Sequence, residues 1–98
     1  MPSREGIYRD IETERLAQDS RWGGAARDDS HREEDWAALV ARHLGLALGE
    51  SAGVGHDPAR FRRQMVRVAA LAVAAVESHD RRHGRGYVAG RHEPGSGF

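Results

Sequence analysis

The apolar residues of this 98-residue chain are concentrated in two segments, and both have the spacing of a helix. The longer segment follows Asp57 and Pro58, a pair suited to the N-cap and first turn of a helix. It is rich in alanine, and its apolar residues recur every three or four positions. We therefore expect a long helix at about 58–82 with its buried side formed by Phe61, Met65, Val68, Ala69, Ala72, Val73 and Val76.

The second apolar segment is the stretch WAALVARHLGLAL, from Trp36 to Leu48. Ser30 and Glu33 precede it with the spacing of a capping box, in which the hydroxyl and the carboxylate each bond a backbone amide of the other residue. The sequence therefore predicts a helix at about 31–48, and Gly49 is its expected stop.

A more highly charged helix is predicted at about 4–20, with Ser3 as its N-cap. Gly23 and Gly24 are expected to end it, and a polar linker then leads to the second helix. The first helix has a narrow apolar face made of Ile7, Tyr8, Ile11 and Leu16.

These three helices predict an all-α fold, with a single helical domain at 1–83 and a Gly-rich C-terminal tail at 84–98. A domain of this size builds only a modest core, and oligomerisation is a common way to complete it. The small side chains of the longest helix also allow another helix to approach closely. We therefore expect a homodimer.

Charge and composition narrow the function classes. Fifteen basic and fifteen acidic residues leave no net charge, so nucleic acid is not an expected partner. The absence of cysteine excludes disulfides, thiolate metal ligands and cysteine nucleophiles. No apolar run approaches the roughly 20 residues of a membrane span, so a cytoplasmic protein without a membrane partner is expected.

The stretch ERLAQDSRWGG, the residues Trp36, Leu39 and Gly45, and the long segment FRRQMVRVAALAVAAVESHDR together resemble the small MazG-like proteins of phages and bacteria. The resemblance covers roughly Ile11 to Arg82. It implies the helical fold of the all-α nucleoside triphosphate pyrophosphohydrolases. In that family, E-E-x-x-E and E-x-x-D motifs on two helices hold Mg²⁺ against a triphosphate.

This chain departs from the family at all five acidic positions. Arg42, His43 and Leu46 stand at the three glutamates of the first motif, and Gln64 and Arg67 stand at the acids of the second. Arginine and protonated histidine repel a divalent cation and attract phosphate oxygens. We therefore expect no catalytic residues, no metal site and no cofactor, and a role in binding or assembly instead.

The candidate ligand is a nucleotide or another phosphorylated molecule, and six residues are candidates for binding it: Trp22, Arg42, His43, Arg63, Gln64 and Arg67. Two alternatives stay open. One is an active, Mg²⁺-dependent pyrophosphohydrolase that uses displaced carboxylates from the set Glu33, Glu34, Asp35, Glu77 and Asp80. The other is a structural protein that interacts with protein partners and has no small-molecule ligand.

Overall fold

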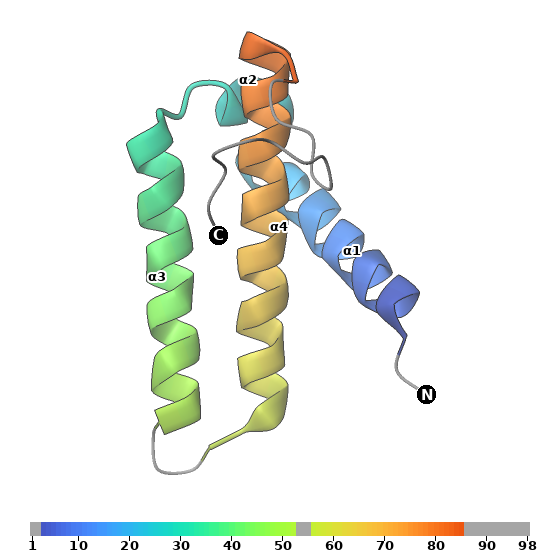
Figure 1. Cartoon of the computed structure of the whole chain (residues 1–98), viewed down its shortest axis with the longest axis vertical. Coiled ribbons are helices and arrows are strands. Elements are labelled where there is room, and N and C mark those ends of the chain that lie inside the picture. Colours follow the sequence, from blue (N-terminus) through green and yellow to red (C-terminus); the bar gives the residue numbers. More distant parts are fainter. Residues whose placement is uncertain (1–2, 53–55, 86–98) are drawn as a thin grey trace, which may run out of the picture.

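Four helices form the part of the chain that the structure, a computed structural model, describes, namely residues 3–52 and 56–85 (Figure 1). They are α1 (Arg4–Trp22), α2 (Gly24–Asp28), α3 (Glu33–Ala52) and α4 (Pro58–His83). There is no strand within these residues, so the predicted all-α class is confirmed. The short helix α2 was not expected, and the predicted tail lies outside the described residues except for 84–85.

The helix ends follow local chemistry where the sequence signal is strong. The Ser3 hydroxyl accepts a hydrogen bond of 3.0 Å from the Gly6 amide, and the Asp57 carboxylate accepts one of 3.0 Å from the Ala59 amide. The helix α1 stops at Gly23, whose φ of 99° lies in the left-handed region that glycine tolerates best. These caps and this helix end confirm the predictions for α1 and α4.

The predicted cap of the second helix is wrong by two residues. The Ser30 hydroxyl donates to the Arg27 carbonyl at the end of α2, and the amide of Arg32 donates to the Asp35 carboxylate at 2.9 Å. The cause is α2, which occupies the expected linker and uses Ser30 for its own last turn. Gly49 does not stop α3, which continues to Ala52, because an isolated glycine is tolerated inside a helix.

Helix α4 lies in the middle, with α3 antiparallel to it on one side and the inclined α1 on the other (Figure 1). Both outer helices pack on α4, but α1 and α3 do not pack on each other within the described residues. The short α2 contacts α1 and α4. One side of α4 is therefore left open between its two neighbours.

The core is small. Trp36 of α3 packs against Leu71 and Ala74 of α4, and Leu39, Val40 and Ala75 border this cluster. The predicted buried side of α4 is wrong for several of its members, because Phe61, Met65, Val73 and Val76 are each more than a third exposed and Ala72 is exposed. The buried residues of α4 are Ala70, Leu71, Ala74 and Ser78.

The apolar face predicted for α1 is likewise exposed at Ile7, Tyr8 and Leu16. The charged face of α1 turns toward α4 instead, and its buried residues are Arg15 and Gln18.

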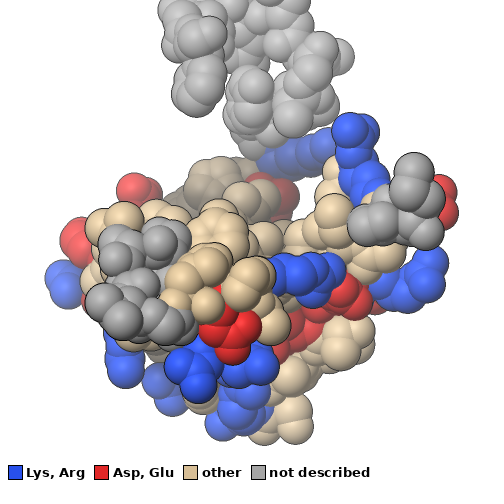
Figure 2. All heavy atoms as spheres, turned by 90° about the horizontal axis from the view of Figure 1, so that it is seen from below, with Lys and Arg blue, Asp and Glu red and all other residues tan. Residues whose placement is uncertain are grey.

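The charged residues of the surface are mixed in sign. Figure 2 shows basic and acidic side chains interspersed over the end of the molecule at which the chain passes from α3 to α4. No helix in the described residues is long and apolar enough to cross a membrane.

Candidate functional site

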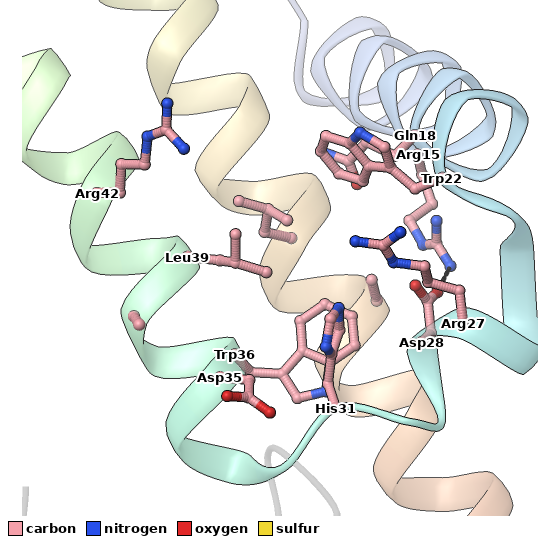
Figure 3. Close-up of a pocket in the computed structure, with 13 residues that line it drawn as sticks. Arg15, Gln18, Trp22, Arg27, Asp28, His31, Asp35, Trp36, Leu39 and Arg42 are labelled. Carbon is pink, nitrogen blue, oxygen red and sulfur yellow. Dashed lines mark hydrogen bonds and ion pairs between the residues drawn. The ribbon is translucent and has the colours of Figure 1, made fainter.

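A groove of about 620 Å³ opens over α4 between α1 and α3, where these two helices fail to meet (Figure 3). Its floor is apolar and its walls carry aromatic and charged groups. The lining residues are Arg15, Gln18 and Trp22 from α1, Arg27 and Asp28 from α2, His31 from the following loop, Asp35, Trp36, Ala38, Leu39 and Arg42 from α3, and Leu71 and Ala74 from α4.

Two consecutive glycines set the wall formed by α1 and α2. Gly23 and Gly24 both have positive φ, 99° and 71°, and they turn the chain sharply from α1 into α2. Trp22 stands just before this turn, and Arg27 projects from α2 into the groove (Figure 3). The glycine pair that the sequence predicts as a helix end therefore also positions one side of the groove.

Helix α2 is held by the buried guanidinium of Arg15. Arg15 donates to the Asp28 carboxylate at 2.9 Å, to the Glu77 carboxylate of α4 at 2.8 Å, and to Asp19 of its own helix. Burial by itself lowers the pKa of Arg15, but the hydrogen bonds with Asp19 and Glu77 outweigh it, and the pKa is raised. Arg15 therefore stays charged and joins three helices.

A second anchor joins the end of α2 to α4. The carboxylate of Asp29 accepts hydrogen bonds from the buried Ser78 hydroxyl at 2.8 Å and from Arg81 at 2.8 Å. These bonds, first from Arg81 and then from Ser78, lower the pKa of Asp29. Arg27 is therefore followed directly by two residues, Asp28 and Asp29, that are bonded to α1 and α4.

Arg27 and Arg42 are the unpaired cations of the groove. Neither side chain has an ion-pair or hydrogen-bond partner in the described part of the chain, whereas Arg15 is bonded to Asp28. They stand on opposite walls, Arg27 on α2 and Arg42 on α3 (Figure 3). The groove lining contains three arginines and two carboxylates, Asp28 and Asp35, so its net charge is +1.

The structure separates the six predicted ligand-binding residues into neighbouring hollows. Trp22 and Arg42 line the groove. Trp22 also lines a smaller cavity of about 200 Å³ with His43 and Arg67, and there His43 lies 3.1 Å from the Gln64 side-chain oxygen. Arg63 lines a third hollow of about 520 Å³.

Arg67 already has an ionic partner. Its guanidinium is 3.7 Å from the carboxylate of Glu14, which also accepts a hydrogen bond from Arg21. Glu14, Arg21 and Arg67 all line the smaller cavity. Both arginines of the smaller cavity are therefore engaged by one carboxylate, whereas the groove has two arginines without a partner and is better suited to an anion.

The sequence did not predict Arg27 and Gln18 as residues of the groove. Arg27 belongs to a segment that looked like a linker, and Gln18 carries no sequence signal of a buried position. Gln18 is 2% exposed and its Oε1 has no hydrogen-bond partner in the described structure. An unpaired buried acceptor of this kind costs about 1–3 kcal/mol.

The carboxylates considered for an active hydrolase do not converge. The Glu77 carboxylate accepts a hydrogen bond from Arg15, and an Asp80 carboxylate oxygen lies 3.1 Å from the His79 Nδ1. The Asp35 carboxylate accepts a hydrogen bond from the backbone amide of Arg32. Within residues 3–52 and 56–85, no group of three or more His, Cys, Asp or Glu side chains could hold a metal ion.

Comparisons of this chain with protein-family models, with curated proteins and with solved structures give no match.

Proposed function

We propose that this protein binds a small phosphorylated ligand without a metal ion, in the groove between α1 and α3. The observation that carries the proposal is the pair of unpaired guanidinium groups, Arg27 and Arg42, on opposite walls of a partly apolar groove. Guanidinium groups bind phosphate oxygens through charge-assisted hydrogen bonds, which are about twice as strong as neutral ones. The indole of Trp22, which is 37% exposed, suits a ligand with a ring.

The resemblance to MazG-like proteins supports the same reading. The residues at the family's acidic positions include Arg42, His43 and Arg67, which favour an anion over a divalent cation. On this proposal the chain keeps the helical architecture of the family and a phosphate-binding role, and it has lost the Mg²⁺-dependent cleavage of a triphosphate.

Isothermal titration calorimetry with inorganic phosphate, pyrophosphate and nucleoside mono- and triphosphates, all in EDTA, tests the proposal. We expect at least one of these ligands to bind, and we expect Arg27→Gln and Arg42→Gln each to weaken binding about tenfold, the loss of roughly one charge-assisted bond. Arg9→Gln is the matched control, because Arg9 is exposed on α1 and does not line the groove.

Three outcomes contradict the proposal. Affinities that are unchanged in both groove variants exclude the groove as the binding site. Pyrophosphate release from a nucleoside triphosphate that requires Mg²⁺ and stops with EDTA favours the active hydrolase. Absence of binding by every ligand favours the structural alternative.

We also propose that the chain forms a homodimer through the outer face of α4. Phe61, Met65, Ala72 and Val76 recur at intervals of four and seven residues, so they form one stripe along the helix, and all four are exposed. The stripe bears no charge in a chain of which 31% is charged. A second copy of the stripe would cover it and enlarge the core, since three of the five buried apolar residues in the described part of the chain are alanines.

A further inference from the structure

We propose that the C-terminal end of α4 binds a divalent transition-metal ion, such as Zn²⁺, between the imidazoles of His79 and His83. The inference goes beyond the proposed function, because neither histidine lines the groove and the phosphorylated ligand needs no metal. Within residues 3–52 and 56–85 no third His, Cys, Asp or Glu side chain converges on the pair. Water therefore fills the other coordination positions, and the site is an open one, unlike a structural zinc site with four protein ligands.

The separation of the two rings is the first observation. His79 and His83 are four residues apart in α4, so they lie on one face of the helix. Their ring centroids are 5.2 Å apart. With a metal–nitrogen bond of about 2.0 Å, a tetrahedral ion shared by two imidazoles holds the ring centres about 5 Å apart. The two rings therefore already have the separation that a shared ion requires.

The ring nitrogens free to coordinate are the second observation. Nδ1 of His79 lies 3.1 Å from the carboxylate of Asp80, and an ionised carboxylate only accepts hydrogen bonds, so Nδ1 is the nitrogen that carries the proton. The neutral ring then has its lone pair on Nε2. A carboxylate bonded to a histidine ligand in this way fixes the tautomer and raises the basicity of the ligand. His83 has no hydrogen bond or ion pair within the described residues, so either of its nitrogens is free to coordinate.

The charges around the pair permit a cation. The two histidines line a hollow of about 560 Å³ between the end of α4 and the start of α3. Its charged residues are Arg32, Arg82, Glu33 and Glu34, so its net charge is zero when the histidines are neutral. Arg82 donates to the backbone carbonyl of His31 at 3.2 Å, and Arg32 lies 3.8 Å from the Glu34 carboxylate. The partial negative charge at the C-terminus of a helix adds a favourable term for a cation.

The two nitrogen ligands determine the class of metal. Imidazole nitrogen suits Zn²⁺, Ni²⁺ and Cu²⁺, whereas Mg²⁺ and Ca²⁺ prefer oxygen ligands. The site therefore differs in chemistry from the Mg²⁺ site of an active pyrophosphohydrolase. An ion that bridges two residues one turn apart also stabilises the folded chain, because the unfolded chain does not hold the two imidazoles together.

Calorimetric titration of the full chain with ZnCl₂, and separately with MgCl₂, tests the inference in a buffer without phosphate or chelator. We expect Zn²⁺ to bind and Mg²⁺ not to bind. His79→Gln and His83→Gln should each weaken Zn²⁺ binding at least about tenfold, since removal of an outer-shell partner alone costs about that much. His56→Gln is the matched control, because His56 is an exposed histidine outside α4.

Nuclear magnetic resonance of the histidine side chains is the second readout. On addition of Zn²⁺ the resonance of His79 Nε2 should shift strongly, while Nδ1 should keep its proton. Both histidines are exposed, so neither substitution should change the far-ultraviolet circular dichroism of the chain.

Three results would overturn the inference. They are the absence of Zn²⁺ binding, an affinity that is unchanged in either His79→Gln or His83→Gln, and an equal loss in His56→Gln, which would indicate non-specific binding to histidines. Phosphate binding in EDTA should be the same in all three variants, so this inference and the proposed function fail or stand separately.

Discussion

The guanidinium of Arg15 lies 2.9 Å from the carboxylate of Asp28, and both side chains are about nine-tenths buried, with exposures of 10% and 8%. This ion pair joins α1 to α2, two helices whose buried residues are all polar or charged. It therefore sets the place of Arg27, the residue next to Asp28, at the wall of the groove.

Replacing Arg15 with methionine should lower the free energy of unfolding by about 3 kcal/mol, because it leaves the buried Asp28 carboxylate without its partner. Urea denaturation measures the effect. The double variant Arg15→Met with Asp28→Asn should recover part of the loss, since the amide is uncharged. A loss below about 1 kcal/mol in the single variant would show that water solvates Asp28 and that the pair is not structural.

The stability of the protein should fall in acid in a way that depends on Asp29. Hydrogen bonds from Arg81 and Ser78 lower the pKa of Asp29 in the folded chain. The folded pKa is therefore below the unfolded value of about 3.9, so the contribution is complete above about pH 5 and is lost as the pH falls through the folded pKa. Urea midpoints between pH 7 and pH 2.5 should decline less steeply for Asp29→Asn than for the natural chain, and equal declines would contradict this account.

Two glycine-to-alanine substitutions should have opposite effects on thermal stability. Gly23→Ala forces a Cβ into a residue at φ 99° and should destabilise the protein by about 1–2 kcal/mol. Gly45→Ala places a Cβ in open space inside α3 and should stabilise it by about 0.5–1 kcal/mol. Calorimetric melting of the two variants tests the difference, and a stabilising Gly23→Ala would be inconsistent with the left-handed turn.

Replacing Ala72 with glutamate should dissociate the proposed dimer, because it places a charge in the middle of the uncharged stripe on α4. Ala59→Glu is the matched control, since it makes the same change in the first turn of the same helix, away from the stripe. Size-exclusion chromatography with light scattering at micromolar concentration distinguishes the forms. A monomeric natural chain at that concentration would rule out the dimer.

The positions of the long helices were predictable because their signals are local. Ser3 and Asp57 each bond an amide two or three residues ahead, and Gly23 ends α1 through its own backbone angle. The alternation of apolar and polar residues in α3 and α4 likewise depends on the 3.6-residue period of a helix. A cap or a period needs no knowledge of the rest of the fold.

The groove and the buried faces were decided by tertiary packing. Apolar residues occur around most of the circumference of α4, so the sequence could not indicate that Ala70 and Ala74, and not Phe61 and Met65, would be covered. That choice follows from the packing of both α1 and α3 on α4. The groove lies where those two helices diverge.

The polar part of the site also depended on distant partners. Arg15 is bonded to Asp28 and Glu77, which lie 13 and 62 residues away in the sequence. Ser78 is bonded to Asp29, which lies 49 residues away. Each residue alone resembles an ordinary surface position, since arginine and aspartate are rarely buried without a partner. The sequence therefore determined the helices through interactions within one or two turns, while burial, ion pairing and the position of Arg27 arose only when the folded chain brought α1, α2 and α4 together.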